Sequence, residues 1–304
     1  MIRRLGKIIA GLIGGMVLVA CALQISQSGN APVPNQPSDT LRVATLNVHY
    51  IILERPTGAW SVADWERRKA PLDAMFKAID ADVVGFQEME SFQRGDPGTV
   101  NLARDWVLQQ NPDYSAAANG DPDVFPSTQP IFYRRDRLQM IDQGWFFFSD
   151  TPDAIYSRTF DGSYPAFASW ALFRPRDGGP DFAVYNVHFE YKSRSNRQLS
   201  AKLVRARIKP VLDSGTPLIL IGDLNARAGS ATTKILADAG LEFAAVTGST
   251  YHFNRGLNLF GAIDHIAVSP PFRPIGPAHV MRRKFQGEWP TDHYPVILDL
   301  ETRK

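Results

Sequence analysis

The sequence predicts a mixed α/β (α+β) fold, and three features of the chain support this expectation. Short apolar runs such as residues 218–221 are typical of strands that are buried on both faces. Other segments, such as residues 60–80, repeat apolar side chains at helical spacing. Polar residues follow several apolar runs, at the point where each strand is expected to end. The composition is that of an ordinary soluble globular protein.

Residues 1–25 are expected to form a signal peptide or lipoprotein leader. Three basic residues precede an apolar stretch at 8–23, which is slightly short for a helix that crosses a membrane. The residues Leu-Val-Ala-Cys at 18–21 resemble the bacterial lipobox, in which cleavage precedes a cysteine that becomes lipidated, here Cys21. The alternative is an uncleaved membrane anchor. Both interpretations place the body outside the cytoplasm and tether it to a bacterial membrane.

Residues 26–38 are rich in Ser, Asn, Gln and Pro, which predicts a flexible tether before one folded domain at 39–304. The formal net charge of the chain is +2, and three basic residues lie in the leader, so the domain is close to neutral. This balance disfavours a tight nucleic-acid binder. The only cysteine is Cys21, so the domain has neither disulfide nor thiolate chemistry.

The first part of the domain alternates between predicted strands and helices. A strand at 41–48 carries Asn47 near its end. A helix lies within 60–80, with Pro71 expected in its first turn because proline is tolerated there. A short buried strand at 82–86 then leads to Glu88.

The middle of the chain is less regular. Residues 101–110 favour a helix, and residues 131–135 favour a strand that ends in basic residues. The three phenylalanines at 146–148 are expected in a core strand rather than in a base-stacking platform. The loop at 151–168 is a candidate for shaping a substrate pocket, although its sequence does not specify one.

The last part of the domain again contains strands that end in polar residues. Strands at 170–173 and 182–187 are expected to form a hairpin that leads to His188. Ser195 and Gln198 predict a capping box at the start of the following helix. A short helix at 232–239 and strands at 263–268 and 294–300 complete the order.

The strand at 218–221 is followed by Gly222, Asp223 and Asn225. If strand geometry continues, the side chains of Asp223 and Asn225 point the same way. A carboxylate and an amide side by side can deprotonate and orient one water. The alternative is a capping turn, because Asp and Asn are common turn residues.

Eight polar residues share a position at or beside the end of an apolar strand. Strand ends converge on one edge of a packed sheet, where sites are usually built. Carboxylates with an amide suit a hard cation such as Mg²⁺ or Mn²⁺. The chain has no zinc-finger spacing, no G-x-S-x-G motif and no GxxxxGK phosphate loop. The eight are Asn47, Glu88, His188, Asp223, Asn225, Asp264, Asp292 and His293.

The motifs around these residues, in this order, resemble those of the endonuclease/exonuclease/phosphatase superfamily, which includes deoxyribonucleases, sphingomyelinases and inositol polyphosphate phosphatases. The resemblance covers nearly the whole domain and implies a four-layer αββα sandwich with two packed mixed β-sheets. Thr291 stands where serine is commoner in the family. The motifs are Thr45-Leu46-Asn47, Gln87-Glu88, Asn186-Val187-His188, Gly222-Asp223-Leu224-Asn225, Ile263-Asp264-His265-Ile266 and Thr291-Asp292-His293-Tyr294-Pro295.

The resemblance also implies a metal site and a catalytic group. Asn47 and Glu88 would help to hold Mg²⁺ or Mn²⁺, and Asp292 would be a further ligand or a contact through water.

By the same resemblance, Asp223 would be the general base on the attacking water, and Asn225 would orient that water. His293 would face the phosphoryl oxygens with Asp264 as its partner, and His188 would lie on the other side of the phosphate.

The function implied is metal-dependent hydrolysis of phosphate esters outside the cytoplasm, by a chain expected to be a monomer. The substrate stays open between nucleic acid, phospholipid and a small phosphoester, because specificity resides in loops. The alternative is a catalytically silent binding or scaffold protein on the same fold. A degenerate member would be expected to lack some of the eight polar residues, and all of them are present.

Overall fold

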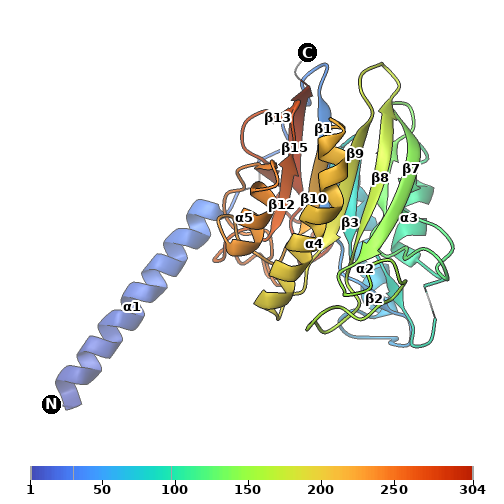
Figure 1. Ribbon diagram of the computed structural model, residues 1–304. Helices are drawn as coiled ribbons and strands as arrows, with labels where there is room; N and C mark the ends of the chain where they lie inside the picture. The colour runs from blue at the N-terminus through green and yellow to red at the C-terminus, as the bar shows by residue number, and fades with distance from the viewer. Residues whose placement is uncertain (1, 30, 97, 303–304) are drawn as a thin grey trace.

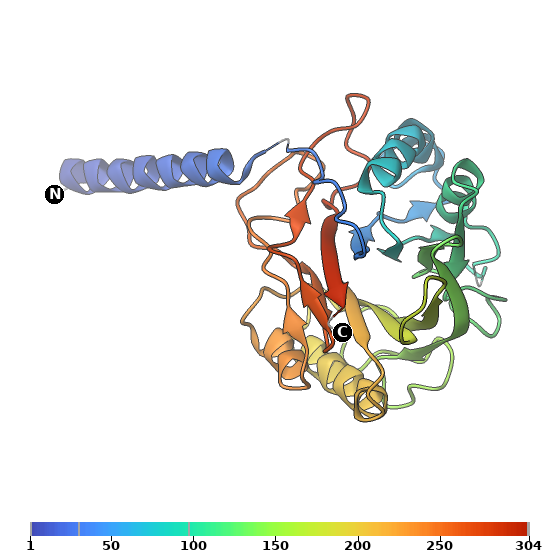
Figure 2. The ribbon, with the colours of Figure 1, turned by 90° about the horizontal axis from the view of Figure 1, so that it is seen from above.

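The computed structural model describes residues 2–29, 31–96 and 98–302. Two large sheets pack face to face, and helices cover their outer faces, which confirms the predicted four-layer sandwich (Figure 1). Figure 2 shows the same layers from above, with the first helix projecting away from the body. The helices are α1 (Ile2–Gln27), α2 (Val62–Ile79), α3 (Leu102–Gln110), α4 (Arg194–Asp213) and α5 (Ala231–Ala237).

Both sheets mix parallel and antiparallel neighbours. The seven-stranded sheet has the order β13-β15-β1-β3-β6-β5, with β14 paired to β15, and the six-stranded sheet has the order β11-β12-β10-β9-β8-β7. The first sheet contains β1 (Leu41–Asn47), β3 (Val83–Gln87), β5 (Tyr114–Ala117), β6 (Ile131–Arg134), β13 (Phe272–Pro274), β14 (His279–Val280) and β15 (Val296–Thr302). The second contains β7 (Leu138–Phe147), β8 (Phe167–Pro175), β9 (Phe182–His188), β10 (Leu218–Asp223), β11 (Glu242–Phe243) and β12 (Asp264–Val268). A separate pair joins β2 (Ile51–Ile52) to β4 (Ser91–Phe92).

Strand direction brings four carboxyl ends to one edge of the sandwich. β1 and β3 run parallel in the first sheet, and β9 and β10 run parallel in the second. The hydrogen bond from Asn47 Nδ2 to Asp223 Oδ2, at 3.3 Å, shows that the ends of β1 and β10 meet across the two sheets. The predicted convergence of strand ends is therefore present in the fold.

Three apolar layers hold the sandwich together. The layer between the sheets includes Val43, Ile219 and Ile221, all fully buried. α2 and α3 pack on the outer face of the first sheet, and α4 and α5 pack on the outer face of the second. The sheets approach closely at Gly85, where a Cβ atom would overlap the side chain of Ile221. Glycine at this position is therefore required by packing rather than by backbone conformation.

Two predicted helix starts are wrong. α2 begins at Val62, because Ser61 accepts a hydrogen bond from the backbone of Asp64, and Pro71 lies inside the helix rather than in its first turn. The helix thus tolerates a proline that removes one backbone hydrogen bond, while Trp65 and Arg68 on its earlier turns are buried.

The cap of α4 is Ser193, whose hydroxyl accepts from the backbone N–H of Asn196 at 3.1 Å. Ser195 lies inside α4, so the predicted capping box is absent, and both serines donate to Asp161. Serines two residues apart give ambiguous capping signals, and the contact with Asp161 is not visible in the local sequence.

The leader forms the helix α1. Its part Lys7–Gln27 is long and apolar enough to cross a membrane, and a signal sequence would also have these properties. The end of α1 touches the body, since Gln24 Nε2 donates to Gly256 O at 2.8 Å and Asn258 N donates to Gln24 Oε1 at 2.7 Å.

The segment predicted as a tether also makes contacts with the body. Gln36 Nε2 donates to Asp82 Oδ2 at 2.8 Å, and the Arg42 guanidinium donates to Pro34 O at 2.7 Å. The flexibility of this segment and the lipidation of Cys21 stay predictions.

Candidate active site

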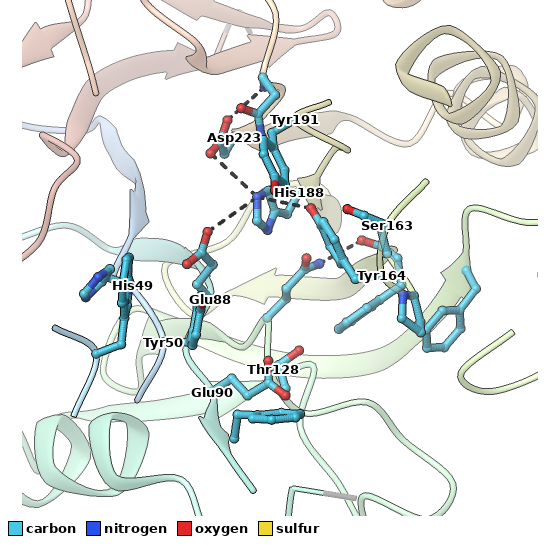
Figure 3. Close-up of a pocket in the computed structure, with 18 of the residues that line it drawn as sticks. His49, Tyr50, Glu88, Glu90, Thr128, Ser163, Tyr164, His188, Tyr191 and Asp223 are labelled. Carbon is cyan, nitrogen blue, oxygen red and sulfur yellow. Dashed lines mark hydrogen bonds and ion pairs between the residues drawn. The ribbon is translucent and has the colours of Figure 1, made fainter. Parts of the chain in front are cut away.

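A pocket of about 1210 Å³ opens at the edge where β1, β3, β9 and β10 end (Figure 3). We call the eight predicted site residues the strand-end cluster. Asn47 and Asp264 stand directly behind this lining and contact it through hydrogen bonds. The members that line the pocket are Glu88, His188, Asp223, Asn225, Asp292 and His293.

Asp223 is the centre of the strand-end cluster. It is the last residue of β10 and is almost completely buried. Its Oδ2 lies 3.7 Å from His188 Nε2 and 3.8 Å from His293 Nε2. One carboxylate thus stands between two imidazoles at the base of the pocket.

His293 is fixed by Asp264, whose Oδ2 lies 2.9 Å from His293 Nδ1. Burial by itself would lower the pKa of His293. The carboxylates of Asp264, Asp223 and Asp292 outweigh that effect and raise its pKa to about 10. The imidazole is therefore protonated at neutral pH and can donate from Nε2 into the pocket.

The pKa of Asp223 is also raised, but here burial acts upward rather than downward. Burial and then the nearby Asp264 raise the pKa of Asp223 to about 6, against the lowering effect of the two imidazoles. A carboxyl with a pKa near neutrality is suited to accept a proton and to release it again.

Glu88 and Asn47 form the opposite wall of the cluster. Asn47 Nδ2 donates to Glu88 Oε1 at 3.0 Å, and Glu88 Oε1 lies 3.8 Å from His188 Nε2. Glu88 has a φ of 54°, a left-handed conformation that is uncommon outside glycine. The chain therefore leaves β3 in a sharp turn that directs this carboxylate toward the pocket.

Two buried contacts tie the segments of the site together. Thr291 Oγ1 donates to Asn47 O at 2.8 Å, so the threonine that departs from the family pattern keeps a structural hydroxyl contact. The buried Arg68 donates to Val48 O at 2.7 Å and to Pro290 O at 3.2 Å. These bonds hold the end of β1 beside the segment that carries Asp292.

The expectation that strand geometry continues to Asn225 is wrong. β10 ends at Asp223, and Asn225 has a φ of 45°. Its backbone N–H donates to Asp223 Oδ1 at 2.8 Å, and its Nδ2 donates to Phe189 O at 2.9 Å. Asn225 therefore orients the Asp223 carboxylate through its backbone, and its amide oxygen is left as an acceptor for a water hydrogen.

A second polar group, which we call the amide bridge, consists of Thr45, Gln87 and Asn186. Gln87 Nε2 donates to Asn186 Oδ1 at 2.6 Å and to Thr45 Oγ1 at 3.1 Å. Asn186 Nδ2 donates to Phe86 O at 2.8 Å. All three side chains are fully buried between the sheets. Three of the motif residues thus join the two sheets rather than line the pocket.

Two groups in the site could hold a metal ion. Asp223, Asp264 and His293 offer ligand atoms that lie within 4.8 Å of one another. However, His293 already brings a positive charge to that group. Asn47, Glu88 and Asp292, the ligands implied by the resemblance, offer only oxygen donors and include two carboxylates, which suits a hard divalent cation.

The aromatic wall of the pocket was missed by the sequence analysis. Tyr164 Oη lies 3.5 Å from His188 Nε2, and the ring of Tyr251 lies 4.9 Å from the ring of His293. Tyr164 belongs to the loop at 151–168, which is the loop that the sequence makes a candidate for shaping a substrate pocket. Tyr251 does not directly follow an apolar run, so the pattern that identifies the strand-end cluster does not extend to it.

Comparison with known proteins gives one family. The sequence profile of the Endonuclease/Exonuclease/phosphatase family matches residues 44–293. An uncharacterised protein of Acanthamoeba polyphaga mimivirus is 26% identical over 216 residues, which are 70% of this chain and 73% of that protein.

The fold is also found in solved structures. A mannosyl-6-phosphatase of Bacteroides thetaiotaomicron has a TM-score of 0.71 and 24% identity over 86% of this chain and 99% of its own. TDP2 of D. rerio, solved with a single-strand DNA product, has a TM-score of 0.61 and 16% identity over 87% of this chain and 100% of its own. At these identities the likeness shows the fold alone.

Proposed function

The chain belongs to the endonuclease/exonuclease/phosphatase family, and from this premise we propose that it hydrolyses phosphate esters with the help of a divalent metal ion. The observation that supports this most directly is the position of Asp223. Its carboxylate lies within 4 Å of both His188 and His293, at the base of the pocket. A proton acceptor between two donors is the arrangement that hydrolysis of a phosphate ester needs.

Each residue has a defined task in this proposal. Asp223 takes a proton from the attacking water, which the amide oxygen of Asn225 orients. His293, kept protonated by Asp264, donates a charge-assisted hydrogen bond to a phosphoryl oxygen. His188 contacts the phosphate from the other side. Phosphoryl transfer asks a protein chiefly for such positioning and neutralisation of charge.

The residues that would hold the metal are Asn47, Glu88 and Asp292. When bound, Mg²⁺ or Mn²⁺ would polarise the phosphate and stabilise the leaving oxygen. The oxygen-only donor set supports a hard cation over zinc, and the hydrogen bond between Asn47 and Glu88 keeps two of the donors together.

The likenesses to known structures leave two substrate classes open. One similar structure is named a phosphatase of a mannosyl phosphate, and another holds a DNA product. We propose that the chain acts as a monomer on a phosphate ester outside the cytoplasm. The helix α1, with a segment long and apolar enough to cross a membrane, supports attachment either by an uncleaved anchor or by lipidated Cys21. Intact-mass measurement of the membrane fraction separates these two forms.

The activity is tested on phosphomonoesters, phospholipids, RNA and plasmid DNA with and without EDTA. We expect hydrolysis that EDTA abolishes and Mg²⁺ or Mn²⁺ restores. Bound metal should also stabilise the fold, by about 2.7 kcal/mol at a metal concentration of 100 times the dissociation constant. Glu88→Gln should reduce this stabilisation.

The matched control is Asp181→Asn, which removes a partly exposed carboxylate before the start of β9, at the end of that strand away from His188. This variant should leave both the rate of ester hydrolysis and the stabilisation by bound metal unchanged. A chain that cleaves no ester and whose melting temperature ignores millimolar Mg²⁺ and Mn²⁺ would instead support a silent binding protein on this fold.

A further inference from the structure

The pocket extends well beyond the strand-end cluster. Figure 3 shows Glu90 and Thr128 on the side of the pocket opposite Asp223. Glu90 reaches this wall because the backbone turns sharply at Glu88, where Glu90 N donates to Glu88 O at 2.8 Å. Glu88 and Glu90 therefore line the same pocket, Glu88 as part of the strand-end cluster and Glu90 outside it.

Three carboxylates gather in this outer part of the pocket. Glu90, Asp96 and Asp123 all line it. Burial and then these three carboxylates raise the pKa of Tyr156, which lines the same pocket. Among the described lining residues, Lys192 is the only Lys or Arg, and its ammonium lies over the ring of Tyr191 at 5.1 Å. The outer part of the pocket is therefore acidic, and because burial and then Glu88 raise the pKa of Glu90 to about 7, Glu90 is fully charged only above neutral pH.

The three carboxylates differ in the hydrogen-bond partners that they already have. Asp96 accepts hydrogen bonds from the backbone of Gly98 and Thr99, so it serves its own turn. Asp123 is exposed to solvent. Glu90 is partly buried, and no residue that the structure describes hydrogen-bonds or ion-pairs with its side chain. A carboxylate in a pocket wall with no protein partner is available to a ligand.

Aromatic side chains complete this part of the pocket. The ring of Trp60 stacks on that of Tyr50, with centroids 6.2 Å apart and planes 10° apart. Trp60 and Phe92 line the pocket and stay partly exposed, at 36% and 45%. Flat apolar faces beside a free carboxylate can bind a small organic group that has both C–H surface and polar hydrogens.

We propose that Trp60, Glu90 and Phe92 form a subsite for the leaving group of the substrate, and that this leaving group carries hydroxyl or ammonium hydrogens and no negative charge. The inference rests on the proposed function, since it assumes that the ester phosphate lies at the strand-end cluster. Glu90 accepts hydrogen bonds from the leaving group, and the aromatic faces cover its carbon skeleton.

The subsite should disfavour the binding of nucleic acids. A polynucleotide would bring a further phosphate toward Glu90, Asp96 and Asp123, and apart from Lys192 no described residue of the lining is a Lys or Arg that could neutralise it. Like charges placed together are a specificity device that rejects the wrong partner. The proposal therefore selects small polyol or amino-alcohol phosphates among the substrates left open above.

The test compares two ligands that differ by one charge. Glycerol 3-phosphate and 3-phosphoglycerate are titrated by calorimetry into the full chain with Mg²⁺, in an Asp223→Asn background that does not turn them over. We expect glycerol 3-phosphate to bind at least about 10-fold more tightly, because 3-phosphoglycerate would bring a carboxylate toward Glu90. With Glu90→Gln added, this preference should fall toward unity, while Asp142→Asn, an exposed acid outside the pocket, should leave it unchanged.

A third ligand, O-phosphoethanolamine, distinguishes the two sources of hydrogens. It should lose more affinity than glycerol 3-phosphate in Glu90→Gln if the subsite takes an ammonium group, and less if it takes hydroxyl groups. Equal binding of glycerol 3-phosphate and 3-phosphoglycerate to the Asp223→Asn chain that keeps Glu90, no binding of any of the three ligands, or a preference that survives Glu90→Gln would overturn the inference. Because binding is measured without turnover, these outcomes are independent of whether the chain hydrolyses esters.

Discussion

The amide bridge and the strand-end cluster are neighbours on the same strands, yet their chemistry differs. Thr45 and Asn47 on β1, and Asn186 and His188 on β9, are two residues apart and so lie on the same face of their strand. The first member of each pair lies between the sheets, and the second lies at their edge.

The two regions differ in whether their polar side chains have hydrogen-bond partners within the protein. In the amide bridge, neutral groups donate and accept among themselves, which is how buried polar groups are normally stabilised. In the strand-end cluster, four acidic side chains meet two imidazoles, and most of the separations are near 4 Å rather than at hydrogen-bond distance. We infer that the bridge serves stability and the cluster serves binding and chemistry, and this contrast can be tested.

The largest effect is expected for Asp223→Asn. The amide keeps the shape of the side chain but cannot accept a proton, so the rate of ester hydrolysis should fall by about 10²- to 10⁴-fold. The melting temperature should stay the same or rise, because the change removes a buried charge beside Asp264. Steady-state kinetics and thermal unfolding on one preparation check both statements. A large loss of stability would remove the contrast between the two regions.

Asn186→Leu should show the opposite behaviour. It leaves Gln87 Nε2 and Phe86 O without their partner in the core, which should lower the free energy of unfolding by about 2–4 kcal/mol. Activity per folded molecule should change far less than in Asp223→Asn. Urea unfolding measures the loss. The double variant with Gln87→Met should recover part of it, since removing both partners leaves fewer unpaired groups.

Gly85→Ala tests the close approach of the sheets beneath both regions. The added methyl would overlap Ile221, so we expect a loss of about 1–3 kcal/mol in the free energy of unfolding. Ile221→Val removes Cδ1, the closer of the two Ile221 atoms in conflict, and should restore part of the loss in the double variant. An Ala variant as stable as the wild type would mean that the sheets can separate at no cost, and that the register of the strand-end cluster is less tightly held.

The smallest effect concerns a histidine outside the cluster. Burial lowers the pKa of His252 to about 3, against an unfolded value of 6.5, so the folded state favours its neutral form. Its stabilising contribution is present above about pH 6.5 and declines as the pH falls toward 3, by up to about 1.4 kcal/mol per pH unit. His252→Phe should therefore flatten the decline in stability between pH 6.5 and 4.5, as measured by urea unfolding. A curve parallel to that of the wild type would contradict this.

Much of the site could be predicted because its residues follow apolar runs. The runs before Asn47, Glu88, His188 and Asp223 are local patterns, and hydrophobic periodicity records them directly. Polar residues at the ends of buried strands are also visible without a structure. The site roles assigned to these residues remain predictions.

The helix starts, the amide bridge and the pocket walls could not be obtained in the same way. By sequence Ser195 with Gln198 is the stronger capping signal, yet Ser193 is the cap and Ser195 already lies inside the helix, although both serines contact Asp161. Gln87 and Asn186 are 99 positions apart, so their hydrogen bond depends on how the two sheets pack.

The sequence by itself determined the strands, their polar ends and the motifs that place the chain in its family, because these depend on residues near one another along the chain. Only the tertiary structure decided which motif residues are buried between the sheets, which line the pocket, and that Glu90 stands in its outer wall without a side-chain partner among the described residues. Those properties depend on strand direction, sheet packing and loop conformation, through which residues distant in the chain become neighbours.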